Sequence, residues 1–297
     1  MLPDDDARTG SPVLTVSEVA VRFGGVAALD QTSLSVRSGS VTGLIGPNGA
    51  GKTTLFNVIS GLQAPERGTV HLFDTDITGM KPHRRARLGL ARTFQRLELF
   101  GTLTAGENVL VGLESTVKWW DRQHLRRLGP RRRRAVVTDP APEPGGPIET
   151  LAADAATCDR LLAGVGLDGL ADRQSAAMST GLARMVELAR ALAISPKVLL
   201  LDEPGSGLDD VESTALGNLL SELAARGMAV LLVEHDMELV MRICDHIYVL
   251  DFGDIIASGP PDSIRTDPMV QAAYLGEAKE GGTAAAEAGS PEGATGP

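Results

Sequence analysis

The sequence has few cysteines and no long apolar segment, and each absence excludes a class of protein. Its 297 residues include only Cys158 and Cys244, which are too few and too isolated for a disulfide framework or a cysteine metal site. The longest apolar runs, near 198–201 and 229–233, fall far short of the roughly 20 residues that span a bilayer. The N-terminus has no basic stretch followed by an apolar one, so we expect no secretory signal. These absences predict a protein of the cytoplasm, for which any membrane association must come through a partner.

A surplus of positive charge is also missing. The formal net charge is -10 at pH 7, whereas general binding to nucleic acid or anionic lipid needs a basic surface. We therefore expect no nucleic acid partner. Hydrophobic residues make up 43% of the chain, which is enough to form the core of one large or two modest domains.

Both ends of the chain are poor in residues that build a core. Residues 1–12 are rich in Asp, Gly and Pro, and 277–297 consist almost wholly of Gly, Ala, Glu, Ser, Pro and Thr, a composition typical of disordered tails. Between the tails, short runs rich in β-branched residues alternate with longer helix-like stretches; the runs are 13–23, 33–36, 41–45, 70–73, 198–202, 229–233 and 247–250. This alternation predicts an α/β fold around a largely parallel sheet, with ligands at the C-terminal ends of its strands.

Residues 115–150 interrupt the alternation. The segment begins near Trp119 and Trp120, continues through a run of arginines at 131–134, and ends in a stretch rich in proline and glycine. We interpret it as an insertion with a mobile connector. A solvated basic loop is the simpler interpretation, and contact with lipid headgroups beside a membrane partner is the alternative.

The most specific motif lies between the apolar run 41–45 and a helical pattern at 54–59. It matches G-x-x-x-x-G-K-[ST] in the strand, loop and helix context that a phosphate-binding P-loop requires. Glycines let successive N–H groups converge on phosphate oxygens, and the start of the helix adds its positive dipole end. We expect Lys52 to reach the β- and γ-phosphates of a nucleotide and Thr53 to ligand Mg²⁺. The nucleotide-binding residues expected here are Gly46, Pro47, Asn48, Gly49, Ala50, Gly51, Lys52, Thr53 and Thr54.

The apolar run 198–201 ends in two adjacent carboxylates, Asp202 and Glu203. Neighbouring residues of a strand point to opposite sides, and two acids placed here are costly to bury unless a cation and a water use them. Asp202 suits the metal side of such a site, and Glu203 suits polarising a water. Taken alone, the pattern also fits a strand that ends in a solvated turn, but beside a P-loop it predicts a hydrolysis site.

Further motifs follow the P-loop in a defined order. They are Arg92-Thr93-Phe94-Gln95, Met178-Ser179-Thr180-Gly181-Leu182-Ala183-Arg184, Asp202-Glu203, Gly207-Leu208-Asp209 and Val233-Glu234-His235-Asp236. In order and spacing this series resembles the ABC transporter ATPases over about 13–276. The resemblance implies a P-loop NTPase with a RecA-like core, an antiparallel β subdomain and a helical signature subdomain at about 96–185.

The resemblance also implies a catalytic set. Gln95 matches the residue that ligands Mg²⁺ and couples to the membrane subunit, and His235 matches the switch histidine near the γ-phosphate. Together with Glu203 they are the expected catalytic residues. The expected Mg²⁺ ligands are Thr53, Gln95 and Asp202.

Other matching residues belong to a dimer of two such domains that close head to tail. Ser179 and Gly181 match the signature loop that caps the nucleotide of the opposite subunit, although Thr180 and Leu182 depart from the usual Leu-Ser-Gly-Gly-Gln. Asp209 matches a contact across the dimer. Phe23 lies where the family places the aromatic that stacks on adenine, and a core phenylalanine at the end of a strand is an equal alternative.

Four short stretches narrow the resemblance to the ATPases of branched-chain amino acid importers, of the type sometimes called the G subunit. They are Arg22-Phe23-Gly24-Gly25, Arg92-Thr93-Phe94-Gln95, Glu234-His235-Asp236-Met237 and Ala273-Tyr274-Leu275-Gly276-Glu277. The implied partners are two permease subunits, a sister ATPase or a second copy of this chain, and an extracytoplasmic binding protein. Residues 97–103 are expected to receive a short permease helix at the cytoplasmic side of the membrane. Importers of urea and short amides, and the lipopolysaccharide export ATPase, share the likeness.

Two other functions remain open at this point. A soluble ABC ATPase that acts on DNA or ribosomes usually carries two fused ATPase units or a long coiled-coil insertion, and the sequence shows neither. The other is a nucleotide-binding regulator that does not hydrolyse its nucleotide. The presence of Glu203 and His235 weakens this hypothesis.

Overall fold

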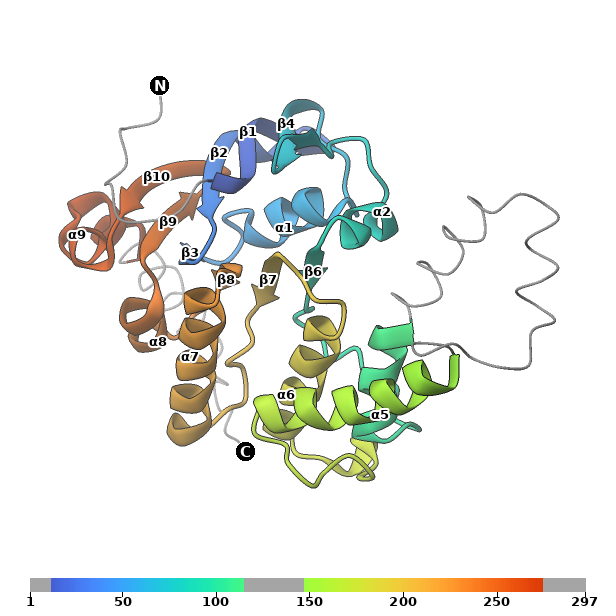
Figure 1. Ribbon diagram of the computed structural model, residues 1–297. Helices are drawn as coiled ribbons and strands as arrows, with labels where there is room; N and C mark the ends of the chain where they lie inside the picture. The colour runs from blue at the N-terminus through green and yellow to red at the C-terminus, as the bar shows by residue number, and fades with distance from the viewer. Residues whose placement is uncertain (1–11, 115–146, 275–297) are drawn as a thin grey trace, which may run out of the picture.

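The computed structural model describes residues 12–114 and 147–274, without the side chains of 147–155. Its strands form two sheets (Figure 1): an antiparallel one with the order β2-β1-β4-β5 and a larger, mainly parallel one with the order β10-β9-β3-β8-β7-β6. The strands are β1 Pro12–Phe23, β2 Val26–Arg37, β3 Val41–Ile45, β4 Arg67–Leu72, β5 Thr75–Asp76, β6 Leu90–Arg92, β7 Val198–Asp202, β8 Ala229–Val233, β9 His246–Asp251 and β10 Asp254–Gly259. The helices are α1 Lys52–Ser60, α2 Pro82–Arg87, α5 Pro147–Gly164, α6 Thr180–Leu192, α7 Asp210–Ala225, α8 Met237–Ile243 and α9 Pro261–Thr266, and residues 105–114 and 268–274 are also helical.

The central strands confirm the sequence prediction, whereas several outer ones are longer than predicted or were missed. The predicted runs 41–45, 198–202 and 229–233 coincide with β3, β7 and β8. β2 is longer than the predicted 33–36, because polar residues alternate with apolar ones along a strand that is buried on one face only. β5, β6 and β10 were not predicted, since two of them have only two or three residues and the third is a half-buried edge strand.

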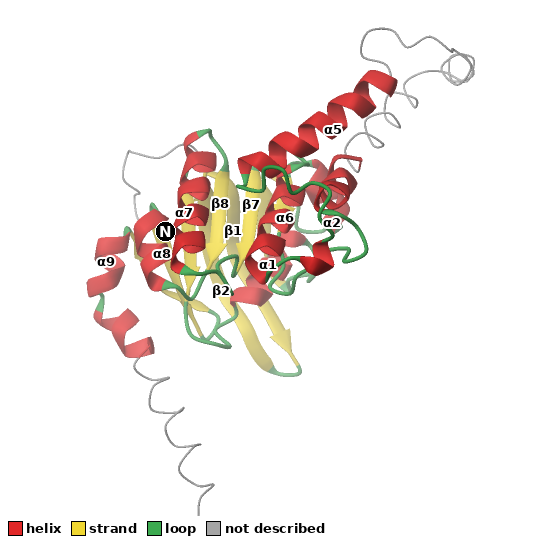
Figure 2. Cartoon of the chain, turned by 90° about the horizontal axis from the view of Figure 1, so that it is seen from below, coloured by secondary structure: helices red, strands yellow, loops and turns green. Residues whose placement is uncertain are grey.

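The large sheet is covered on both faces. Alternate residues of each central strand belong to different cores, as the two-residue period of a strand requires. Leu199 and Leu201 of β7 pack into the core formed with α6, α7 and α8, whereas Leu200 and Leu231 pack into the core shared with α1 and the antiparallel sheet. Figure 1 shows α1 between the two sheets, and Figure 2 shows α6, α7 and α8 alongside β7 and β8. Burial on both faces explains the uninterrupted apolar runs in the sequence.

Shortening Leu200 to alanine is expected to lower the free energy of unfolding by about 2–5 kcal/mol, because a fully buried leucine leaves a cavity when truncated. Urea unfolding followed by circular dichroism measures the change. Leu88→Ala is the matched control, since Leu88 is 39% exposed, and we expect it to change stability by less than about 0.5 kcal/mol. Equal losses in the two variants would contradict the placement of Leu200 in the core.

Several predicted segments fall wholly or partly outside the described residues. These are residues 1–11 of the N-terminal tail, the C-terminal tail 277–297, and 115–146 of the insertion. Pro12 is the first residue of β1, and residues 147–150 of the predicted insertion belong to α5. Within 12–114 and 147–274, no helix combines the length and the apolarity needed to cross a bilayer.

Candidate functional site

Four neighbouring parallel strands bring the predicted site residues to one edge of the large sheet. The strands are β3, β8, β7 and β6, in that spatial order. The P-loop follows β3, His235 follows β8, Glu203 follows β7, and Gln95 follows β6. Because the C-terminal ends of parallel strands share an edge, segments that are far apart in the sequence meet there.

The P-loop has a backbone that only glycine permits at two positions. Gly46 has φ 148°, and a Cβ there would lie 1.9 Å from the carbonyl oxygen of Leu250. Gly51 has φ 111° and precedes α1, and a Cβ there would lie 2.4 Å from the carbonyl oxygen of Ala28. Any side chain at either position would therefore force the loop away from its neighbours.

The N-terminus of α1 is suited to binding an anion. Its first turn contains no acidic residue, so its positive dipole end is not neutralised from within the helix. Lys52 is buried and its Nζ donates to the carbonyl oxygens of Gly46 and Pro47, the second at 2.8 Å. These bonds hold the ammonium group against the loop that the sequence assigns to phosphate binding. Thr53 and Thr54 lie in the same first turn, with Thr53 exposed and Thr54 half-buried.

Among the three predicted catalytic residues, Glu203 contacts both of the others. Gln95 Nε2 donates to Glu203 Oε2 at 3.0 Å, and His235 Nε2 lies 2.9 Å from Glu203 Oε1. Glu203 itself has φ 51°, a conformation that costs a non-glycine residue about 1–3 kcal/mol. The left-handed turn takes Glu203 out of the line of β7, so its carboxylate meets Gln95 and His235 rather than continuing the strand. This arrangement holds a carboxylate with one neighbour on each oxygen.

Asp202, one residue earlier, is in a different environment. Its side chain is 2% exposed, and Arg92 Nη2 contacts its Oδ2 at 3.0 Å. Burial raises the pKa of Asp202, while the charge of Arg92 and its hydrogen bond oppose that rise. Arg92 also donates to Asn57 Oδ1 at 2.8 Å and Ser60 Oγ at 2.9 Å, so it ties this carboxylate to α1.

The predicted metal ligands offer the donor types that Mg²⁺ prefers. Thr53 supplies a hydroxyl, Gln95 an amide oxygen and Asp202 a carboxylate, and Mg²⁺ in nucleotide sites is held by few protein oxygens with water and phosphate completing its shell. Among the described residues, no group of three or more His, Cys, Asp or Glu side chains forms a metal cluster of its own. The donor types fit a Mg²⁺ ion that arrives with a nucleotide.

The remaining predicted residues lie on other elements. Phe23 closes the turn between β1 and β2 and is 53% exposed, which rules out the core alternative for this residue. Ser179 is the N-cap of α6, where its side chain accepts from the N–H of Leu182 at 3.3 Å. Asp209 is the N-cap of α7 and forms a reciprocal capping box with Glu212.

Gly181 lies against that capping box. A Cβ at Gly181 would lie 2.7 Å from Glu212 Oε2, the oxygen that accepts the N–H of Asp209 at 3.1 Å. Glycine at 181 therefore lets the signature loop approach the start of α7. The two predicted dimer motifs, which begin at residues 178 and 207, are thus packed together within one chain.

Three residues that sequence reasoning did not assign also shape the site. Arg92 holds Asp202, Arg184 donates to the backbone of Gln95, and the buried carboxylate of Glu234 accepts the N–H of Gly205 and of His235. All three stand within motifs that the sequence had already singled out, although no role was assigned to them. Only the tertiary structure shows which carboxylate and backbone groups these side chains bind.

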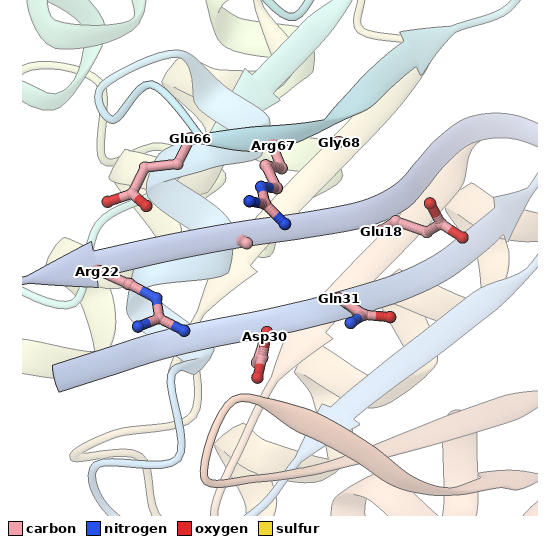
Figure 3. Close-up of a pocket in the computed structure, with 8 residues that line it drawn as sticks. Glu18, Arg22, Asp30, Gln31, Glu66, Arg67 and Gly68 are labelled. Atoms are coloured by element: carbon pink, nitrogen blue, oxygen red, sulfur yellow. The ribbon is translucent and has the colours of Figure 1, made fainter. Parts of the chain in front are cut away.

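Two hollows differ in their relation to the site. One of about 850 Å³ borders residues 47–50 of the P-loop, and its lining includes the exposed apolar side chains of Phe252 and Met269. The other, of about 630 Å³, lies on the antiparallel sheet and is lined by charged and polar side chains including Arg22, Glu66 and Arg67 (Figure 3). None of the predicted site residues lines this second hollow, so it is separate from the candidate site.

Comparison with known proteins agrees with this geometry. The model of the ABC transporter family matches residues 29–206, and a model described as branched-chain amino acid ATP-binding cassette transporter matches 255–280. The high-affinity branched-chain amino acid transport ATP-binding protein LivG of Salmonella typhimurium is 39% identical over 268 residues, which are 90% of this chain and 99% of LivG. The lipopolysaccharide export system ATP-binding protein LptB of Acidithiobacillus ferridurans is 36% identical over 245 residues, which are 82% of this chain and 89% of LptB.

Solved structures lead to the same result. The ADP conformation of MJ1267, an ATP-binding cassette of an ABC transporter, is 31% identical and has a TM-score of 0.72, with 90% of this chain and 99% of that chain covered. The family and the α/β fold predicted from the sequence are thereby confirmed. The chain belongs to the ABC transporter ATP-binding proteins and carries the nucleotide-binding ATPase domain of that family.

Proposed function

We propose that this chain hydrolyses ATP, with Mg²⁺, to drive a membrane importer of branched-chain amino acids or related small amides. The contact of Glu203 with both Gln95 and His235, at the sheet edge that also carries the P-loop, is the observation that carries the hydrolysis assignment. The importer assignment is supported by the similarity to LivG along nearly the whole of both chains and by the match at 255–280.

The proposed chemistry assigns one task to each group. Backbone N–H groups of the P-loop and the start of α1 bind the phosphates, and Lys52 swings from its loop carbonyls to the β- and γ-phosphates. Glu203 orients the attacking water, while His235 contacts the γ-phosphate. Thr53, Asp202 and Gln95 would hold Mg²⁺, which supplies charge stabilisation on the transferring phosphoryl group when it is bound.

A second ATPase subunit completes the proposed site. Ser179 at the start of α6 and Gly181 are proposed to cap the nucleotide of the opposite subunit, with Asp209 at the contact between the two. The helix start is suited to this because α6 has no acidic residue in its first turn. Phe23, exposed at its turn, is proposed to stack on adenine. The partner is a sister ATPase or a second copy of this chain.

The proposed permease contact is the segment after Gln95. Leu97 is 36% exposed and Phe100 is 51% exposed, with the half-buried Leu99 between them. Exposed apolar side chains in one short loop favour a contact with a partner over a solvated loop. This contact would place the chain on the cytoplasmic face of the membrane.

The experiment is purification of the tagged chain from its native membranes, with the bound proteins identified by mass spectrometry. We expect two permeases, a second ATPase and an extracytoplasmic binding protein, whose ligand then names the substrate. Recovery with lipopolysaccharide export components would favour the LptB-like alternative. Recovery with ribosomal or DNA-bound proteins and no permease would contradict a transport function.

The double variant Leu99→Asp/Phe100→Asp is expected to lose the permeases in the same purification, by at least about tenfold, because two buried carboxylates cannot be desolvated in an apolar contact. Its ATP affinity should match that of the wild type. Leu62→Asp, at a side chain that is 55% exposed elsewhere on the surface, is the control and should retain the permeases. Full permease recovery by the double variant would rule out this docking segment.

A further inference from the structure

Helix α6 carries a buried pair of opposite charges one turn beyond its start. Arg184 and Glu187 are 8% and 2% exposed, and Arg184 Nη1 lies 3.4 Å from Glu187 Oε2. A buried ion pair contributes little net stability, because desolvation of both groups offsets their attraction, and apolar residues of similar volume are often as stable. Stability alone therefore does not account for a charged pair at this position.

The guanidinium of Arg184 reaches out of the helix to the segment that carries Gln95. Nη1 donates to the carbonyl oxygen of Phe94 at 2.8 Å, and Nη2 donates to that of Gln95 at 2.5 Å. Two donors on one rigid planar group fix two successive carbonyls in a set geometry, whereas the freely rotating donors of a lysine ammonium group do not impose one. Residues 93–97 form no helix or strand, so these bonds replace the ladder that would otherwise hold the backbone.

Glu187 supports the same segment. Burial raises its pKa, while Arg184, Arg190 and the backbone N–H groups of Glu98 and Phe94 act in the opposite direction. Its Oε2 contacts Arg184 and its Oε1 lies 3.9 Å from Arg190 Nη2, so the carboxylate keeps the guanidinium of Arg184 in place.

The other side of the segment is attached to the large sheet. Arg92, three residues before Gln95, contacts Asp202, and its guanidinium lies 5.5 Å from the ring of Phe56 in α1 and 4.9 Å from that of Phe94. Gln95 therefore lies between an anchor on the sheet and an anchor on α6. A displacement of α6 relative to the sheet would move the carbonyl of Gln95 and, with it, the amide that touches Glu203.

We propose that Arg184, held by Glu187, is a positioning residue that fixes Gln95 against Glu203 according to the position of α6. Ser179 stands at the start of the same helix, so one rigid element connects the loop proposed to meet the opposite nucleotide with the hydrolysis site of its own subunit. Arg184 itself does not contact the nucleotide. The inference rests on the proposed function, because it takes Gln95 and Glu203 as parts of the hydrolysis site.

The test is a double-mutant cycle of Arg184→Met and Gln95→Ala in the full chain, with kcat, KM and nucleotide affinity measured for each variant. Loss of hydrogen bonds from a charged donor predicts a fall in kcat of about tenfold to a hundredfold for Arg184→Met, with nucleotide affinity unchanged. In the Gln95→Ala background, Arg184→Met is expected to lower kcat by less than about twofold, because Arg184 acts through the Gln95 side chain, which is already absent.

Further variants separate positioning from folding. Arg184→Met/Glu187→Leu removes both charges, so it should fold while keeping the lowered kcat of Arg184→Met. Arg184→Lys should recover only part of the loss, since lysine lacks the rigid planar pair of N–H donors of a guanidinium group. Arg160→Met, at an exposed arginine of α5, is the control and should behave as the wild type.

The outcomes distinguish the inference from the function on which it rests. If Arg184→Met lowers kcat equally in both backgrounds, or if the paired variant recovers wild-type kcat, the positioning role is wrong while the hydrolysis site stands. If Gln95→Ala has wild-type kcat, the assignment of Gln95 to the hydrolysis site is wrong.

Discussion

Replacing Glu203 with glutamine is expected to lower ATP turnover by about a hundredfold to ten-thousandfold, the range typical of losing a general base. The substitution keeps the size of the side chain, so the contacts with Gln95 and His235 can persist in modified form. It removes the negative charge that would orient and polarise the attacking water. ATP binding should remain, because Glu203 is not part of the P-loop.

Two measurements check this result. Phosphate release under saturating ATP gives turnover, and size-exclusion chromatography with ATP detects the dimer that should accumulate when hydrolysis stops. Glu66→Gln is the control, because Glu66 is exposed on the antiparallel sheet, in the hollow of Figure 3, and should turn over ATP at the wild-type rate. Unchanged turnover in Glu203→Gln would end the catalytic assignment of this residue.

Replacing Lys52 with methionine is expected to weaken ATP binding by about tenfold to a hundredfold, the effect of losing hydrogen bonds from a charged donor. Turnover should fall with it. The structure adds a second reason, because Lys52 also bonds the carbonyl oxygens of Gly46 and Pro47 within the loop. Methionine keeps the apolar length of the chain but leaves those carbonyls with one donor fewer.

Isothermal titration with a slowly hydrolysed ATP analogue measures the affinity. Lys81→Met is the matched control, since Lys81 is exposed at the start of α2, and its affinity should equal that of the wild type. A Lys52→Met variant with wild-type affinity would show that the loop binds phosphate through its backbone alone.

The sequence predicted the central strands of the large sheet more accurately than the strands at the sheet edges. The strands β3, β7 and β8 were predicted at their observed bounds because they are buried on both faces and read as uninterrupted apolar runs. The missed strands β5, β6 and β10 are short or lie at or next to sheet edges, where pairing with a neighbour, and not their own composition, makes them strands. Locating them required knowledge of which segments lie side by side.

The candidate site also has one part that the sequence predicts locally and another part that depends on the fold. The P-loop could be predicted because glycine positions, lysine and threonine follow each other within one short segment, so their geometry is local. The role of Glu203 was predicted from its place after an apolar strand beside a P-loop, and those of Gln95 and His235 from the series of motifs. Glu203 contacts both residues because β6, β7 and β8 are neighbours in the sheet.

The sequence by itself determined the family, the phosphate loop and the order of the motifs, since these depend on residue types at short spacing. Only the tertiary structure decided that Arg92 forms an ion pair with Asp202, that Gly181 lies against the capping box of Asp209, and that Arg184 donates to the carbonyl oxygen of Gln95. Each of these contacts joins segments separated by tens of residues or more. Such pairings depend on how the chain packs, because a buried charge is stabilised by whichever partner the fold places beside it.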